Sequence, residues 1–156
     1  MELQTIQKKI YEIRGKQVML DFDLALLYGV ETKVLKQGVK RNIRRFPLDF
    51  MFELTQEEFN SLRSQFVTSN KRGGIRYMPF AFTEQGVAML SSILKSETAI
   101  EINISIIRAF VAVRQYLSVA NHNNKEIEEL KQRMKALEEG TEALASATPL
   151  FNLPSQ

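Results

Sequence analysis

Cationic side chains recur on one side of the segment 33–44. Counted at about 100° per residue from Lys33, a helix places Lys36 at about 300°, Lys40 at about 340° and Arg44 at about 20°. Gln37 and Arg41 flank this arc on the same helix. No acidic residue interrupts the segment 32–46. A helix with positive charge concentrated on one side suits binding to a polyanion such as DNA.

The opposite side of the same helix is apolar, and a second short helix is expected before it. The residues expected to be buried on the apolar side are Leu35, Val39, Ile43 and Phe46. In the preceding helix, Asp21 is expected to be the N-cap, Ala25 permits a close helix contact, and Gly29 ends the helix. A small residue followed four positions later by a glycine is typical of a helix-turn-helix. An ordinary helical hairpin with solvated lysines is the alternative, and the one-sided charge favours DNA.

We therefore expect the basic helix 32–45 to face the major groove of duplex DNA. Gln37 and Thr32 are the candidates for reading bases, and the lysines and arginines are expected to position the helix on phosphates. The predicted DNA contacts in this helix are Thr32, Lys33, Lys36, Gln37, Lys40, Arg41 and Arg44.

Length and composition indicate one ordinary globular domain with a short extension. The chain has 156 residues, of which 44% are hydrophobic, and a net charge of +3. It has no cysteine, which excludes disulfides and thiolate metal sites. No run approaches about 20 apolar residues and the N-terminus has no apolar signal core, so we expect a cytoplasmic protein without membrane contact.

Side chains suited to catalysis are present but are not grouped in a way that predicts an enzyme. The neighbouring carboxylates of Asp21 with Asp23 and of Glu57 with Glu58 are better explained by helix capping. His122, the only histidine, lies in a polar stretch. We therefore expect no catalysis, no metal and no cofactor.

Short strands and capped helices are expected around the basic helix. The segment 6–20 predicts a strand pair turning at residues 14–16, and 50–54 predicts another strand. Thr55 with Glu58 has the spacing of a capping box. Two apolar runs within 65–82 suggest a hairpin beside the DNA-binding helices, like a wing, and its basic residues Lys71, Arg72 and Arg76 are further candidates for phosphate contacts.

The C-terminal third is expected to be helical. Thr83 and Ser96 each predict a helix start, and the second helix is long. The polar stretch 121–124 predicts a break, after which apolar residues follow a heptad pattern. Its core positions are Ile127, Leu130, Met134, Leu137, Thr141 and Leu144. This seam can pair two copies or fold back on the domain, and we favour a homodimer. Proline-containing residues 145–156 are expected to be disordered.

Two motifs give the chain a family resemblance. RN-x-x-RFP-x-DF-x-F-x-L, at 41–54, and FTEQG, at 82–86, occur in order. Together they resemble the KilA-N-type DNA-binding domains, and most closely the branch named for the N-terminal part of a phage ORF-six product, found in antirepressor-like proteins. The similarity extends over about residues 6–117.

The resemblance implies an α+β fold and a role in transcriptional regulation by phages or mobile elements. We expect a compact mixed domain with a helix-turn-helix-like pair and short strands or hairpins at 1–120, a coiled-coil-like helix at 121–147 and a tail at 148–156. The expected partners are duplex DNA and a second copy. The alternative is an antirepressor that sequesters a repressor or host protein without binding DNA.

Overall fold

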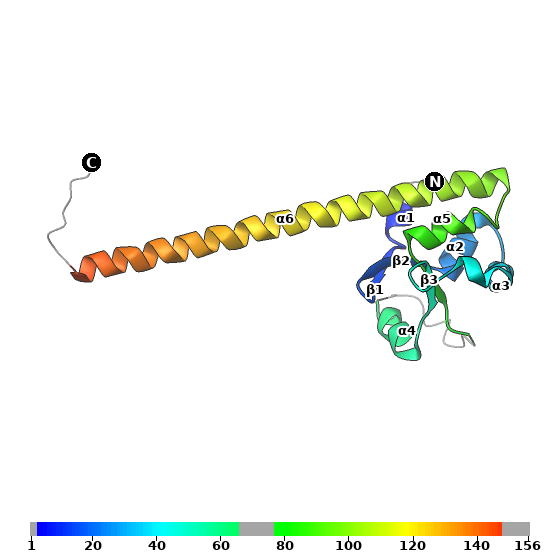
Figure 1. Ribbon diagram of the computed structural model, residues 1–156, viewed down its shortest axis with the longest axis horizontal. Coiled ribbons are helices and arrows are strands. Elements are labelled where there is room, and N and C mark those ends of the chain that lie inside the picture. Colours follow the sequence, from blue (N-terminus) through cyan, green and yellow to red (C-terminus); the bar gives the residue numbers. More distant parts are fainter. Residues whose placement is uncertain (1–2, 66–76, 148–156) are drawn as a thin grey trace. The chain divides into compact units, whose positions relative to one another are not determined.

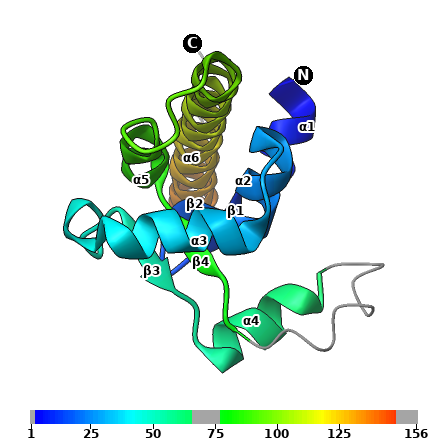
Figure 2. The same ribbon diagram turned by 90° about the vertical axis from the view of Figure 1, so that its right-hand side faces the viewer.

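The fold is a small antiparallel sheet with helices on both faces, which confirms the predicted α+β class. The computed structural model describes residues 3–65 and 77–147, and the chain divides into two compact units, Met1–Val113 and Arg114–Gln156. Figure 1 labels the helices α1 to α6 and the strands β1 to β3, and Figure 2 also labels β4. In chain order they are α1 (Leu3–Gln7), β1 (Tyr11–Ile13), β2 (Lys16–Leu20), α2 (Asp21–Tyr28), α3 (Thr32–Arg41), the 3-10 turn η1 (Ile43–Arg45), β3 (Met51–Glu53), α4 (Gln56–Arg63), β4 (Phe80–Phe82), α5 (Glu84–Leu90) and α6 (Glu97–Ala147).

The four strands of the first unit lie in the order β1-β2-β4-β3, and every neighbouring pair is antiparallel. β4 is central, because Phe82 is paired with Met19 of β2 on one side and with Met51 of β3 on the other. Both sides of Phe80–Phe82 are therefore occupied. The prediction for 65–82 had these residues in a local hairpin, whereas in the structure their partners are β2 and β3. The rest of that predicted hairpin falls on 66–76, outside the described residues.

Strand alternation divides the buried side chains between two hydrophobic clusters. Met19 and Phe82 point to the face shared with α2, α3, α5 and the first part of α6. Val18, Leu20 and Ala81 point to the other face, where α4 packs. Figure 2 shows α4 on the opposite side of the strands from α2 and α5. α3 is thus supported by the larger cluster through Leu35 and Val39.

The two motifs of the family resemblance pack against each other. Thr83 caps α5, because its hydroxyl oxygen accepts from the Gly86 N–H at 3.3 Å. The Thr83 hydroxyl lies 2.8 Å from the carbonyl oxygen of Asp49, and the Thr83 N–H donates to the carbonyl of Phe50 at 3.0 Å. A Cβ at position 86 would lie 2.0 Å from the Phe50 oxygen. Only glycine at this position therefore allows α5 to come this close to the backbone of Phe50, which directly precedes β3.

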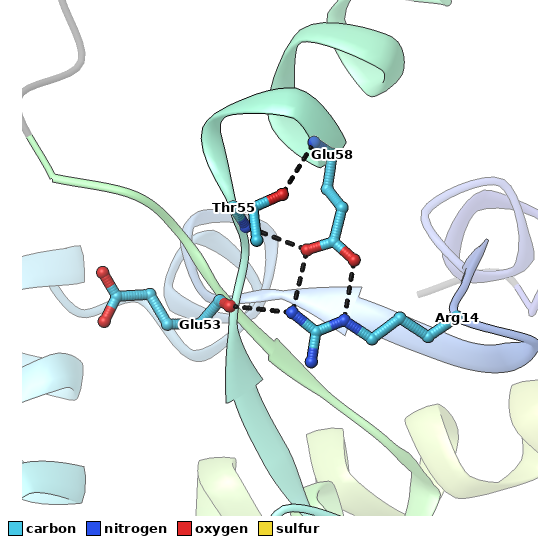
Figure 3. Close-up of polar contacts among 4 residues, drawn as sticks. All are labelled: Arg14, Glu53, Thr55 and Glu58. Atoms are coloured by element: carbon cyan, nitrogen blue, oxygen red, sulfur yellow. Dashed lines mark hydrogen bonds and ion pairs between the residues drawn. The ribbon is translucent and has the colours of Figure 1, made fainter.

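A second long-range contact closes the β1–β2 hairpin onto α4. Arg14 and Gly15 both have positive φ, 57° and 73°, as a two-residue type I′ turn requires. The Arg14 guanidinium donates to both carboxylate oxygens of Glu58, at 2.7 and 3.0 Å (Figure 3). It also lies 4.1 Å from the centroid of the Phe52 ring. Glu58 also completes the predicted capping box with Thr55, which is confirmed. One carboxylate thus caps α4 and anchors the hairpin.

The N-terminal strand pair is shorter than predicted. Residues 3–7 form the helix α1, and only residues 11–20 form the hairpin. Ile6 lies fully buried on the inner side of α1. Its spacing to Ile10 fits a helical turn as well as a strand, so the pattern of isoleucines did not distinguish the two.

α6 is a single continuous helix, so the break predicted at 121–124 is wrong. Ser96 caps it as predicted, accepting from the Ala99 N–H at 3.1 Å. No proline or glycine lies between Glu97 and Glu139, and asparagine or histidine costs a helix only a fraction of a kcal/mol, roughly 0.5, per residue. His122 Nε2 lies 3.1 Å from Glu126 Oε1, one turn on.

The segment Glu97–Gly140 is long and apolar enough to cross a membrane by length and composition. Core helices of soluble proteins also meet that criterion. In the first unit, Ile106, Ala109 and Phe110 of α6 are buried in the core. This part of the helix therefore serves as a core element.

Replacing Glu58 with Gln is expected to lower the free energy of unfolding by about 1 kcal/mol at neutral pH, because the ion pair is lost while the amide oxygen still caps α4. The hydrogen bond from Arg14 lowers the pKa of Glu58 to about 2. The native carboxylate therefore binds fewer protons than the unfolded one, and its stabilisation is complete above its usual pKa and is lost as pH falls toward 2.

Urea denaturation at pH 7 and pH 3 measures this difference. The gap between wild type and Glu58→Gln should narrow at the lower pH. Glu57→Gln is the matched control, since Glu57 is exposed in the same helical turn. An equal loss in both variants, or a gap independent of pH, would contradict the assignment.

Candidate nucleic-acid interface

α2 and α3 form the predicted helix pair, joined by a tight turn at residues 29–31. α2 ends at Gly29, which has a φ of 75° and the left-handed conformation predicted for it. The Val30 N–H donates to the Ala25 carbonyl at 3.0 Å, and Ala25 itself is buried. This is the C-terminal arrangement that a glycine permits, and it turns the chain directly into α3.

Asp21 has a different role from the N-cap predicted for it. Leu20 occupies the N-cap position, and Asp21 is the first residue of α2 with its side chain 2% exposed. Its carboxylate accepts from the Phe80 N–H at 2.8 Å. Burial raises the pKa of Asp21, while the Phe80 amide and Lys36 act in the opposite direction. A nearby cation is therefore needed to lower the free-energy cost of keeping the buried Asp21 carboxylate charged.

Lys36 supplies that cation, so the prediction that it joins the free basic row is wrong. Its Nζ lies 3.5 Å from Asp21 Oδ2 and donates to the Met78 carbonyl at 2.9 Å. It also lies 4.6 Å from the centroid of the Phe80 ring. Only 15% of the Lys36 side chain is exposed. Its charge is used to join α2, α3 and the residues leading into β4.

The outward side of α3 has a different centre from the one predicted. Its exposed residues are Lys33, Val34, Gln37, Lys40 and Arg41. The buried residues Leu35 and Val39 lie at about 200° and 240°, so the direction opposite to them is about 40°, which is the position of Gln37. Lys36, at about 300°, lies at the edge of the buried side. Val34 was not among the predicted contacts, yet it is 49% exposed on this surface.

α3 ends earlier than predicted, which moves Arg44 off its basic row. Arg41 is the last helical residue, and Asn42 has φ −122° and ψ 35°. The Asn42 Nδ2 donates to the Gly38 carbonyl at 2.8 Å, which caps the C-terminal end. Arg44 and Arg45 follow in η1. Ile43 was predicted to be buried, but it is exposed, because the α-helical periodicity ends at Asn42. The helix therefore ends before the stop predicted at Phe46-Pro47.

The surface formed by α3 and η1 is strongly cationic. We call this surface the α3 outer face; its cations are Lys33, Lys40, Arg41, Arg44 and Arg45, and all are exposed. No ion pair involves any of them within the described residues, and no acidic side chain lies between 32 and 48. Thr32, the other predicted base reader, is partly buried at the first position of α3.

Three other predicted contacts have no described position. Lys71, Arg72 and Arg76 lie within 66–76, outside the described residues. In the parts of the chain that are described, no three acidic, histidine or cysteine side chains are grouped so that they could hold a metal ion.

Lys36→Met is expected to destabilise the fold by about 3 kcal/mol, because it leaves the buried Asp21 carboxylate without its cation. Burial raises the native pKa of Asp21 above its unfolded value. Protonation at low pH therefore relieves the buried charge, and the deficit of the variant should shrink as pH falls. Urea denaturation across pH 4 to 7 measures this dependence.

Lys33→Met is the control on the same helix, because Lys33 is exposed and should change stability by only about 0.5 kcal/mol or less. The double variant Asp21→Asn/Lys36→Met keeps an acceptor for Phe80 and should recover part of the loss. Equal stability of Lys36→Met and Lys33→Met would refute the role given to Lys36.

The comparisons with known proteins identify a family. The model of the ORF6N domain matches residues 8–93, which is more than half of the 156-residue chain and includes the α3 outer face. Neither the curated proteins nor the solved structures gave a match. ORF6N domains are related to the KilA-N and phage antirepressor branch. The chain belongs to the ORF6N domain family.

Proposed function

We propose that this protein is a phage-type transcriptional regulator that binds duplex DNA through the α3 outer face. The observation that carries the proposal is the division of charge on α3. Lys36 is held inside by Asp21, whereas Lys33, Lys40 and Arg41 are exposed without a partner in the described structure. Cations that serve the fold and cations available to a ligand are thus different residues.

The arrangement of α3 suits insertion into a major groove. α2 and α3 are joined by a short turn, as in helix-turn-helix proteins, where the second helix contacts base edges. Leu35 and Val39 fix one side of α3 in the core, which leaves the side centred on Gln37 for the ligand. Arg44 and Arg45 in η1 extend the positive charge beyond the helix end, where phosphates flank a groove.

The family supports a regulatory role of this kind. Membership in the ORF6N family, with its relation to phage antirepressors, fits a cytoplasmic regulator of phage or mobile-element origin. An antirepressor that binds an acidic repressor through the same cations is the alternative, and it predicts no affinity for duplex DNA.

The second unit supplies a surface for pairing two copies. Ile127, Leu130, Met134 and Leu137 of α6 are about half-exposed or more, at the heptad positions predicted from the sequence. Leu144 continues the pattern in the sequence. Pairing along this seam would join two DNA-binding units, as in regulators that bind two half-sites.

Lys40→Gln/Arg41→Gln is expected to weaken binding to every duplex sequence and to reduce the slope of log affinity against log salt by about 2, since each lost phosphate contact lowers it by about 0.9. Fluorescence anisotropy with a random duplex at several salt concentrations measures both quantities. Lys125→Gln/Lys135→Gln removes the same charge from exposed positions of α6 and should change neither.

Unchanged affinity and slope in Lys40→Gln/Arg41→Gln would contradict the assignment of the α3 outer face. Absence of duplex binding by the wild type at low salt would contradict DNA binding itself and favour the protein-binding alternative.

Leu130→Glu/Leu137→Glu is expected to convert a dimer into a monomer, because it places four carboxylates in one paired seam. Light scattering on the full chain gives the mass in solution. Gln132→Glu/Ala136→Glu adds the same charge at positions outside the seam and should remain dimeric. A monomeric wild type would contradict the proposed pairing of two copies along this seam.

A further inference from the structure

The α3 outer face carries two side chains that phosphate binding does not require. Gln37 lies at about 40° on the helix, between Lys33 at 0° and Arg41 at about 80°, and Val34 lies at about 100°, on the far side of Arg41. They are three residues apart and are therefore neighbours on the helix surface. Both are exposed, and Val34 is 49% exposed.

The chemistry of this pair fits a base edge. The amide of Gln37 offers a donor and an acceptor side by side, and no hydrogen bond between described residues uses them. An adenine presents the complementary N7 acceptor and N6 donor in the major groove, and the methyl group of its thymine partner offers an apolar contact. A half-exposed valine gains from burial against such a methyl group, whereas it gains nothing from a phosphate.

We propose that Gln37 and Val34 give this protein a preference for A·T pairs, with Gln37 bound to adenine N6 and N7 and Val34 in contact with a thymine methyl group. Lys33, Lys40 and Arg41 flank the pair and hold the helix on the two phosphate backbones. The inference rests on the proposed DNA binding and assigns the base specificity of the same surface.

The neighbouring contacts explain why this surface is suited to specific recognition. The ion pair of Lys36 with Asp21 fixes the buried side of α3. The hydrogen bond from the Asn42 side chain to the Gly38 carbonyl fixes its C-terminal end. A helix held at these points presents Gln37 and Val34 at defined positions. Side chains placed by a rigid support discriminate between bases better than side chains on a loose one.

Selection of duplexes from a random library by the full-length protein tests the inference. The wild type should enrich adenine at one position, with a preference of about fivefold or more over guanine. Gln37→Arg should shift that position to guanine, because the guanidinium binds O6 and N7 of guanine in the same way. Val34→Ala should reduce the preference for thymine without abolishing binding.

Gln115→Arg is the matched control, since it adds the same charge at an exposed position of α6 and should leave the selected sequence unchanged. Wild-type protein that binds duplex with a steep salt dependence but shows no adenine preference would overturn the inference and leave the proposed function standing. The same selected base in wild type and Gln37→Arg would overturn it as well. No duplex binding by the wild type would remove both.

Discussion

The buried pair of Asp21 and Lys36 is the interaction on which the arrangement of the first unit depends. Asp21 opens α2 and accepts from the backbone of β4, and Lys36 reaches the same point from the middle of α3. A carboxylate this deeply buried is costly without a cation, and a lysine this covered is costly without an anion. Each charge therefore lowers the free-energy cost of burying the other. Together the two residues fix the positions of α2, α3 and β4 relative to one another.

The other polar contacts of the fold follow the same principle of joining distant segments. Arg14 on the hairpin meets Glu58 on α4, 44 residues away, and Thr83 meets the carbonyls of Asp49 and Phe50. The Tyr28 hydroxyl donates to Asn103 and so ties α2 to the buried side of α6. The sheet is small, with strands of three to five residues, so these contacts supplement a limited ladder of backbone hydrogen bonds.

Features determined by neighbouring residues could be predicted from the sequence. The left-handed Gly29, the capping box of Thr55 and the cap at Ser96 each depend on chemistry within a few positions. Features that depend on distant partners could not. Nothing near Lys36 in the sequence indicates that its partners are Asp21 and the Met78 carbonyl. The end of α3 at Asn42 was also missed, because Phe46-Pro47 gave a stronger stop signal a few residues later.

The outward direction of α3 was open to prediction in part. Leu35 and Val39 alone place Gln37 at the centre of the exposed side, but the inclusion of Ile43 and Phe46 extended the helix too far and shifted the expected basic row. Lys71, Arg72 and Arg76 lie within 66–76, outside the described residues, so their role stays a prediction.

The inward and outward residues of α3 are separate sets. Leu35, Lys36 and Val39 hold the helix on the domain. The outward residues pack against nothing in the core; they are Lys33, Val34, Gln37, Lys40 and Arg41. Mutations in the second set can therefore accumulate with little loss of stability, so the chemistry of this surface can diversify quickly while the fold stays the same.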